Sequence, residues 1–345
     1  MVHDWVLYIA AFSTAFAISN VMTPVAKKIS VKLGAIDMPK KRGMHSKPMP
    51  RLGGIAIVVG FMATVFLLYR YVENVDVRKL IGFFIGAMII VMLGIVDDIK
   101  NLPAKVKFAV QIIAAIIPIC FGIRIHVVMW PMTYALLKLS IPITVLWIVG
   151  LTNAVNLIDG LDGLAAGVSS IAALCVMVLC ILTGDETAVV LTAALAGSCL
   201  GFLPRNFNPA EIFMGDTGAT FLGYTLAVTS ILGLFKGYAM IGLMVSILSV
   251  GFPIFDTLFA MTRRMAKGQP IMQADRGHLH HKLIDKGFSQ KQAVIILYAI
   301  SVLCGLVAIF IALKDEMILV VVLFAVLVLS LLVYYVNHRK RNKED

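Results

Sequence analysis

The chain has 345 residues, of which 60% are hydrophobic and only 14% are charged, and its formal net charge is +11. A soluble globular protein of this length does not carry so large an apolar fraction, so the composition excludes that class and indicates a polytopic membrane protein. We expect an all-α protein with about eleven transmembrane helices, forming a single integral-membrane domain over residues 1–345.

Eleven apolar runs approach the length of roughly 20 residues that a helix needs to cross a bilayer. In chain order they are Trp5–Val21, Leu52–Leu68, Leu80–Val96, Val106–Gly122, Leu136–Leu151, Leu164–Leu182, Ala188–Leu203, Thr217–Leu234, Ala239–Phe255, Ala293–Leu313 and Met317–Val336. The first run does not resemble a cleaved signal peptide, because nothing basic precedes it and no small-residue cleavage site follows it. Pro253 predicts a kink near the inner end of the ninth run, where a lateral path to lipid would open.

The lysine and arginine residues predict the orientation. With the N-terminus outside, 23 of the 30 fall on the cytoplasmic side and seven on the other. The positive-inside rule therefore favours an external N-terminus and a cytoplasmic C-terminus in the cell membrane. The net positive charge then reflects orientation and anionic membrane lipids, and it is no indication of nucleic-acid binding. All five cysteines lie within apolar runs without metal-like spacing, which indicates a packing role.

The most informative polar segment is residues 153–163, which lies between two strongly apolar runs. It contains Asn153, Asn156, Asp159 and Asp162, with glycines at 160 and 163. Charged side chains near membrane depth are costly and usually line a functional cavity. The glycines suggest a helix that ends and re-forms, so that the polar groups converge on one point. The alternative is a plain polar loop between helices.

Two further clusters precede this segment. Lys47 and Arg51 lie on a proline-rich stretch before Gly53 and Gly54, and fixed cations on a stiff loop suit phosphate binding. An ordinary positive-inside loop is the alternative. The pair Asp97–Asp98 ends the third run and is followed by lysines, including Lys107. Such acids can reach a common Mg²⁺ ion or substrate, or form only a solvated helix end.

Two clusters follow it. Asp216 precedes an apolar run and is either a metal ligand or a helix N-cap, while Phe213 either stacks on a base or packs against helices. The last cluster holds three histidines that would first suggest zinc, but no cysteine pair or glutamate accompanies them at a useful spacing. A phosphate-binding role fits these basic surroundings better; the residues are His278, His280 and His281.

All these clusters fall on the predicted cytoplasmic side, so we expect five loops to form one active site, at residues 22–51, 97–107, 152–163, 204–216 and 256–292. A secondary transporter would instead scatter its ionisable groups near the bilayer midplane within related halves. A purely structural membrane protein has no need of clustered acids.

The ordered motifs together resemble the polyprenyl-phosphate N-acetylhexosamine-1-phosphate transferase superfamily over nearly the whole chain. They are Lys-Pro-x-Pro-Arg-x-Gly-Gly, Asp-Asp, Asn-x-x-Asn-x-x-Asp-Gly-x-Asp-Gly, Phe-Met-Gly-Asp and His-x-His-His. The resemblance implies a Mg²⁺-dependent enzyme, with Mn²⁺ as a substitute, that joins a sugar 1-phosphate to undecaprenyl phosphate and releases UMP. The product would start cell-envelope glycan synthesis, of teichoic acid or a similar polymer. A homodimer is compatible with the family.

The branch is indicated by two motifs. His-Leu-His-His-Lys and Phe-Met-Gly-Asp-Thr-Gly depart from the pentapeptide translocase type and are similar to the bacterial UDP-GlcNAc branch. UDP-GlcNAc is therefore the expected donor, and UDP-MurNAc-pentapeptide or another UDP-N-acetyl sugar is the alternative.

The resemblance also implies roles for individual residues. Asp216 and Asp98 would ligate the metal, and one of Asp97 and Asp98 would activate the lipid phosphate. The other expected catalytic residues are Lys107, His278, His280 and His281, and the expected substrate-binding residues are Lys47, Arg51, Asn153, Asn156, Asp159, Asp162, Asn206 and Phe213. Direct attack by the lipid phosphate and a phospho-aspartate intermediate both remain open.

Overall fold

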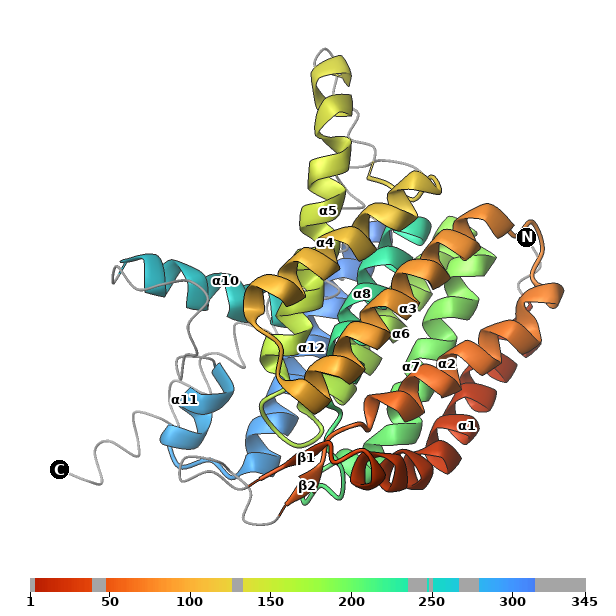
Figure 1. Cartoon of the computed structure of the whole chain (residues 1–345). Coiled ribbons are helices and arrows are strands. Elements are labelled where there is room, and N and C mark those ends of the chain that lie inside the picture. The colour runs from red at the N-terminus through yellow and green to blue at the C-terminus, as the bar shows by residue number, and fades with distance from the viewer. Residues whose placement is uncertain are drawn as a thin grey trace.

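The computed structural model describes residues 4–38, 48–125, 133–234, 247, 251–266 and 279–313, and these segments are almost entirely helical (Figure 1). Seven of the described helices are long and apolar enough to cross a membrane. They lie within α1 (Trp5–Lys32), α2 with its short extension η1 (Gly54–Leu68, Tyr69–Tyr71), α3 (Val77–Lys100), α5 (Thr133–Ile158), α6 (Leu164–Thr183), α7 (Glu186–Asn206) and α12 (Gln290–Leu313). The expectation of an all-α polytopic membrane protein is confirmed.

Two further helices, α4 (Ala104–Cys120) and α8 (Gly215–Leu234), occupy two more of the expected apolar runs. The run Met317–Val336 and most of Ala239–Phe255 lie outside the described residues, so the count of eleven spans stays a prediction. The kink expected at Pro253 also remains a prediction. Pro253 lies in α10 (Gly251–Ala266), and the residues just before Gly251 lie outside the described part of the chain.

Helices extend further than the apolar runs, which corrects the expected loop boundaries. α1 continues to Lys32, α3 to Lys100 and α5 to Ile158, so much of the loops expected at 22–51, 97–107 and 152–163 is helical. The segment expected as a loop at 256–292 contains the rest of α10 and the short helix α11 (Leu279–Asp285). A hydropathy window ends at the first polar residues, whereas hydrogen bonding of the backbone continues past them.

A small element joins α1 to α2. Strands β1 (Ile36–Asp37) and β2 (Met49–Pro50) pair antiparallel, with Ile36 opposite Pro50, at one end of the helical bundle (Figure 1). The backbone N–H of Arg51 donates to the carbonyl of Ala35, at 3.1 Å, and to the hydroxyl of Ser30, at 3.0 Å. These bonds hold the Arg51 backbone against the end of α1.

The backbones of α2 and α8 touch where both helices begin. The N–H groups of Gly53 and Gly54 donate to the carbonyls of Phe213 and Met214, at 3.0 and 2.8 Å. A Cβ atom added to Gly54 would collide with the backbone of Gly218. The Gly53–Gly54 pair therefore lets another backbone approach closely, and that backbone belongs to the segment that carries Asp216.

Candidate active site

Acids from two helices meet a lysine from a third at the end of the bundle that carries β1 and β2. The Lys107 ammonium group on α4 donates to Asp97 Oδ2, at 2.8 Å, and to Asp216 Oδ2, at 3.0 Å. Asp97 lies in the last turn of α3 and Asp216 in the first turn of α8. Residues 97, 107 and 216 are thus within one hydrogen-bonded group, as the motifs predicted.

Asp97 and Asp216 differ in their access to solvent. The Asp97 side chain is almost fully buried, and its Oδ1 accepts the backbone N–H of Leu102 at 2.6 Å. The Asp216 side chain is 24% exposed. Of the two acids, Asp216 is therefore the one that an incoming ligand reaches more directly.

Asp98 faces a different set of partners from its neighbour Asp97. Its Oδ1 accepts the Arg51 Nε–H at 3.1 Å and the backbone N–H of Asp216 at 3.0 Å. Its Oδ2 accepts the backbone N–H and the hydroxyl of Thr217, at 2.9 and 2.6 Å. The carboxylate thus caps the N-terminus of α8, where a negative charge is favourable.

This geometry does not support the prediction that Asp98 is a metal ligand. Its side chain has no exposed surface, and both of its oxygens already accept two hydrogen bonds each. The backbone at Gly215 is shaped around it: the residue has φ of +71°, and an added Cβ would meet the Arg51 carbonyl and the Asp98 carboxylate. Asp98 therefore positions Asp216, while Arg51 pairs with Asp98 and, at 3.3 Å, with Asn101 Oδ1.

The turn between α5 and α6 brings two more acids to the same end. α5 ends at Ile158 and α6 begins after Gly163, which has φ of +79°, so the predicted break in the helix is confirmed. Burial raises the pKa of Asp159 to about 8, helped by the negative charges of Asp216, Asp98 and Asp162. The Asp159 carboxyl is therefore subject to the negative potential of the acids on α3 and α8.

Asp162 and Asn206 act mainly within the protein. Asp162 Oδ2 accepts the Asn208 amide at 2.9 Å and the Ala210 N–H at 3.1 Å. Asn206 is only 3% exposed; its Oδ1 accepts the Gly163 N–H at 3.1 Å, and its amide donates to the Ile212 carbonyl at 3.0 Å. Both side chains therefore fix the loop between α7 and α8, and Phe213, at the end of that loop, remains partly exposed.

The two asparagines of the central motif lie on the last two turns of α5. The Asn153 amide donates to Gln111 Oε1, at 2.6 Å, and to the Val149 carbonyl, at 2.7 Å. Gln111 lies four residues after Lys107, on the same face of α4. Asn156 is partly buried one turn closer to the acids. Asn153 is therefore joined to the helix that carries Lys107.

Part of the predicted site cannot be placed. Lys47 and His278 lie outside the described residues. His280 and His281 belong to α11, but the positions of their side chains are also outside the described part of the chain. The start of α11 is tied to α10, because Asp256 Oδ1 accepts the Leu279 N–H at 2.8 Å.

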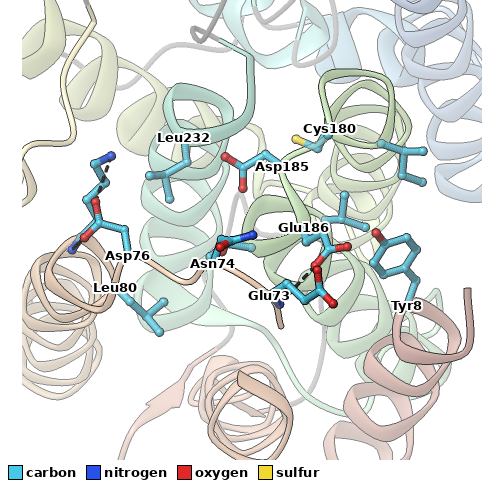
Figure 2. Close-up of a pocket in the computed structure, with 14 residues that line it drawn as sticks. Tyr8, Glu73, Asn74, Asp76, Leu80, Cys180, Asp185, Glu186 and Leu232 are labelled. Atoms are coloured by element: carbon cyan, nitrogen blue, oxygen red, sulfur yellow. Dashed lines mark hydrogen bonds and ion pairs between the residues drawn. The ribbon is translucent and has the colours of Figure 1, made fainter. Parts of the chain in front are cut away.

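A partly open cavity of about 330 Å³ lies elsewhere, between the start of α3 and the starts of α1 and α7 (Figure 2). Asp76 on its wall is 21 residues before Asp97, so the two lie about 32 Å apart along α3. Figure 2 shows Glu73, Asp185 and Glu186 around it. These acids would repel a nucleotide diphosphate, and none of the predicted site residues lines the cavity.

Comparison with known proteins matches residues 80–234 to the model of glycosyl transferase family 4. Over 304 residues the chain is 40% identical to a protein of Bacillus subtilis named probable undecaprenyl-phosphate N-acetylglucosaminyl 1-phosphate transferase, covering 87% of this chain and 84% of that protein. The chain belongs to glycosyl transferase family 4.

Other members of the family are also similar to this chain. It is 32% identical over 316 residues to the decaprenyl-phosphate N-acetylglucosaminephosphotransferase of Mycobacterium tuberculosis, covering 83% of this chain and 78% of that protein. It is 28% identical over 300 residues to an undecaprenyl-phosphate alpha-N-acetylglucosaminyl 1-phosphate transferase of Thermotoga maritima, covering 85% and 86%. The resemblance to polyprenyl-phosphate N-acetylhexosamine-1-phosphate transferases is confirmed, and with it the assignment as a transferase.

The family implies a magnesium ion, and the donor chemistry of this site fits one. Mg²⁺ in nucleotide sites takes one or two carboxylates together with substrate phosphate oxygens and water. The Asp216 side chain is exposed enough to bind such an ion, and the charge of Asp216 also affects the pKa of Asp159. Among the described residues no three histidine, cysteine or acidic side chains form a ready-made metal site, so the substrate phosphates would have to complete the coordination.

Several residues of this family 4 site were not predicted. Thr217 and Asn101 hold Asp98 and Arg51, and Gln111 holds Asn153. For Gln111 a signal existed, because it is a polar residue four positions after Lys107 within the apolar run Val106–Gly122. Asn208 and Tyr298 carried no comparable signal; the Tyr298 hydroxyl donates to the Gly163 carbonyl at 2.5 Å.

Proposed function

We propose that this protein transfers N-acetylglucosamine 1-phosphate from UDP-GlcNAc to undecaprenyl phosphate, releasing UMP and forming undecaprenyl-diphosphate-GlcNAc. The observation that supports it most is the cluster of Asp97, Lys107 and Asp216, drawn from three helices to one end of the bundle, with Asp159 beside it. The named activities of the relatives from Bacillus subtilis and Thermotoga maritima support the same transferred group and the same acceptor.

The reaction brings a lipid phosphate and a nucleotide diphosphate together, so several negative charges share one site. Phosphoryl transfer asks a protein chiefly for in-line positioning and for compensation of charge on the transferred group. Lys107 supplies a fixed positive charge between Asp97 and Asp216, and Lys47 and the histidines 278, 280 and 281 are proposed to add more. Arg51 acts through Asp98, because its Nε–H is already engaged there.

We assign the proposed Mg²⁺ to Asp216, with Asp159 as a candidate second carboxylate. When bound, the ion would neutralise charge on the diphosphate oxygens. Mn²⁺ offers similar oxygen coordination and is proposed as a substitute. Asp98 contributes by orienting the backbone of Asp216 rather than by ligation.

We favour direct attack by the lipid phosphate. One of its oxygens would form a bond to the β-phosphorus of UDP-GlcNAc, while the bond from that phosphorus to the bridging oxygen breaks and UMP leaves. The second pKa of such a phosphate is about 6, so the nucleophile is already ionised near neutral pH. Asp97 and Asp98 are each held by hydrogen bonds to the protein, which fits positioning better than nucleophilic attack.

The site is proposed to face the cytoplasm, where UDP-sugars are made. The uneven distribution of lysine and arginine supports this orientation. The initiation of a cell-envelope glycan, teichoic acid or a similar polymer, follows from the proposed product.

The test uses purified full-length protein with undecaprenyl phosphate and a panel of UDP-sugars, with UMP and lipid-linked product as readouts. The proposal expects UMP release with UDP-GlcNAc and at most a few per cent of that rate with UDP-MurNAc-pentapeptide. Preference for another donor would overturn the sugar assignment. Solute flux in proteoliposomes without UMP release would overturn the enzyme assignment for this chain.

A further inference from the structure

The partly open cavity at the starts of α1, α3 and α7 combines apolar walls with a small number of polar groups (Figure 2). Leu80, Ile181, Val189 and Leu232 contribute apolar surface. Its volume of about 330 Å³ falls within the range of about 300–1,000 Å³ that is typical of small-molecule sites. The cavity is therefore large enough for a small organic ligand, and much larger than a single metal ion needs.

The hydroxyl of Tyr8 lies at this cavity without a hydrogen-bond partner. Tyr8 on α1 is only 3% exposed, and among the residues that the structure describes none hydrogen-bonds to its hydroxyl. Figure 2 shows the hydroxyl directed toward Glu186 on the cavity wall. Buried polar groups in proteins nearly always have a hydrogen-bond partner, so this exception points to a ligand that supplies one.

Four acids also line the cavity, and two of them act within the protein. Asp76 and Asp185 each accept the backbone N–H of the residue three positions later, at 3.2 and 2.9 Å, and so cap α3 and α7. Asp76 is also neutralised by Lys79, at 3.1 Å. The other two acids, Glu73 and Glu186, form no ion pair within the described part of the chain.

Glu73 and Glu186 are held close together although both carry a negative charge. The Glu73 backbone N–H donates to Glu186 Oε2 at 3.2 Å. The start of α7 favours the charge of Glu186, but it gives no role to the Glu73 carboxylate or to the Tyr8 hydroxyl. Acids of one sign beside low-dielectric walls attract a cation to the cavity.

We propose that this cavity binds a small organic cation through a primary ammonium group. Such a group has three N–H donors, which match the carboxylates of Glu73 and Glu186 and the hydroxyl oxygen of Tyr8. The apolar side chains pack against the carbon atoms of the same ligand. A metal ion fits less well, since no three histidine, cysteine or acidic side chains among the described residues are arranged to hold one. The site lies at the other end of α3 from Asp97 and does not depend on the proposed function.

Binding of spermidine to the purified full-length protein, followed by isothermal titration calorimetry, tests this site. The wild type should bind it saturably. Glu186→Gln removes the charge but keeps an acceptor for the Glu73 N–H, and it should raise the Kd about tenfold through loss of a charge-assisted hydrogen bond. Glu211→Gln is the matched control, because it makes the same change at an acid that is 58% exposed and lies outside the cavity. It should change the Kd less than about twofold.

Tyr8→Phe separates ligand binding from stability. The hydroxyl has no partner in the free protein, so its removal should leave the melting temperature without ligand within about 2 °C of the wild type. The Kd for spermidine should nevertheless rise about fivefold, because one hydrogen bond to the ligand is lost. Absence of saturable binding by the wild type, or an unchanged Kd in both Glu186→Gln and Tyr8→Phe, would overturn the proposal. Tighter binding of Ca²⁺ than of spermidine would overturn the assignment to an organic cation.

The ammonium group could belong to a free amine or to a lipid headgroup, and a competition experiment distinguishes the two sources. Phosphatidylethanolamine and phosphatidylglycerol are added in turn to mixed detergent micelles that contain the protein and spermidine. Competition by phosphatidylethanolamine alone would identify a lipid headgroup, and competition by neither lipid would identify a free amine. Equal competition by both lipids would show that the ammonium group is not recognised and would overturn the proposal.

Discussion

Asp98 and Thr217 join the end of α3 to the start of α8 through two hydrogen bonds to one carboxylate oxygen, at 2.9 Å from the backbone N–H and 2.6 Å from the hydroxyl. Asp97, the preceding residue, instead binds Lys107. The adjacent acids therefore have separate functions: Asp98 fixes the helix that carries Asp216, and Asp97 holds the Lys107 ammonium group beside Asp216.

Asp98→Asn should destabilise the protein as well as inactivate it. The change leaves the partly buried Arg51 guanidinium group without its anionic partner. It also places a side-chain amide against the backbone N–H groups of α8, and together these effects cost about 2–4 kcal/mol. Displacement of Asp216 should lower kcat on the order of 100-fold. Thermal unfolding in detergent and UMP release measure the two effects. Thr217→Ser keeps the hydroxyl and is the control; a wild-type melting temperature for Asp98→Asn would contradict the capping role.

Lys107→Gln should lower kcat/KM by about 100- to 1000-fold, because it removes the fixed charge between Asp97 and Asp216. Lys107→Arg should recover part of the activity, since the charge is kept but the geometry differs. Lys79→Gln changes an exposed lysine at the opposite end of α3 and should have no effect. Initial rates of UMP release check this series, and a fully active Lys107→Gln variant would remove Lys107 from the catalytic group.

The raised pKa of Asp159 predicts a pH dependence of stability. In the unfolded chain this carboxyl has a pKa near 3.8, and in the folded protein about 8. Between these values the folded protein keeps a proton that the unfolded chain has lost, so the free energy of unfolding falls as the pH rises and levels off above about pH 8. Melting temperatures between pH 4.5 and 8.5, without divalent cations, should fall less steeply for Asp159→Asn. Parallel curves for the two proteins would show that this carboxyl does not retain its proton.

Asn206 and Phe213 should respond differently to substitution, although both were expected in the nucleotide pocket. Asn206→Leu leaves the Gly163 N–H and the Ile212 carbonyl without their partner and should cost about 2–4 kcal/mol of stability. Phe213→Leu should leave the melting temperature within 2 °C of the wild type, and raise the KM for UDP-GlcNAc by roughly five- to tenfold through lost stacking. The paired measurement of melting temperature and KM separates the roles, and a shared loss of stability would argue against nucleotide stacking.

Chelation should stop the reaction. EDTA is expected to abolish UMP release, with recovery on addition of Mg²⁺ and partial recovery with Mn²⁺. Mg²⁺ together with UDP-GlcNAc should raise the melting temperature of the wild type by mass action, but not that of Asp216→Asn. Full activity in chelator would rule out the proposed metal.

Much of this fold could be predicted because membrane helices appear in the sequence as long apolar runs. The break between α5 and α6 was also predictable, since Gly160 and Gly163 interrupt a polar segment between two such runs. The extension of α1 to Lys32 and of α10 to Ala266 could not be predicted. Hydropathy marks where a helix leaves the hydrocarbon core of the bilayer and not where its backbone hydrogen bonds end. The pairing of β1 with β2 involves only two residues in each strand and leaves no periodic pattern.

The residues that form the site could be predicted from the sequence, but the separate role of each residue could not. The common cytoplasmic side and the family resemblance predict that Asp97, Asp98 and Asp216 meet, yet nothing in an Asp-Asp pair says which acid faces inward. That choice depends on the start of α8, more than 100 residues later, where the N–H groups of Asp216 and Thr217 select Asp98. Asn206 was likewise expected to bind substrate, because the sequence does not show that its hydrogen-bond partners are the backbone groups of Gly163 and Ile212.

The contact between Gly54 and Gly218 limits how this enzyme could be adapted to other donors. Since no side chain separates the two backbones, any residue larger than glycine at position 54 would push α8 away from α2 and displace Asp216. Laboratory evolution toward a larger sugar would therefore have to remodel the surrounding turns, such as the one ending at Phe213, and leave this helix crossing untouched.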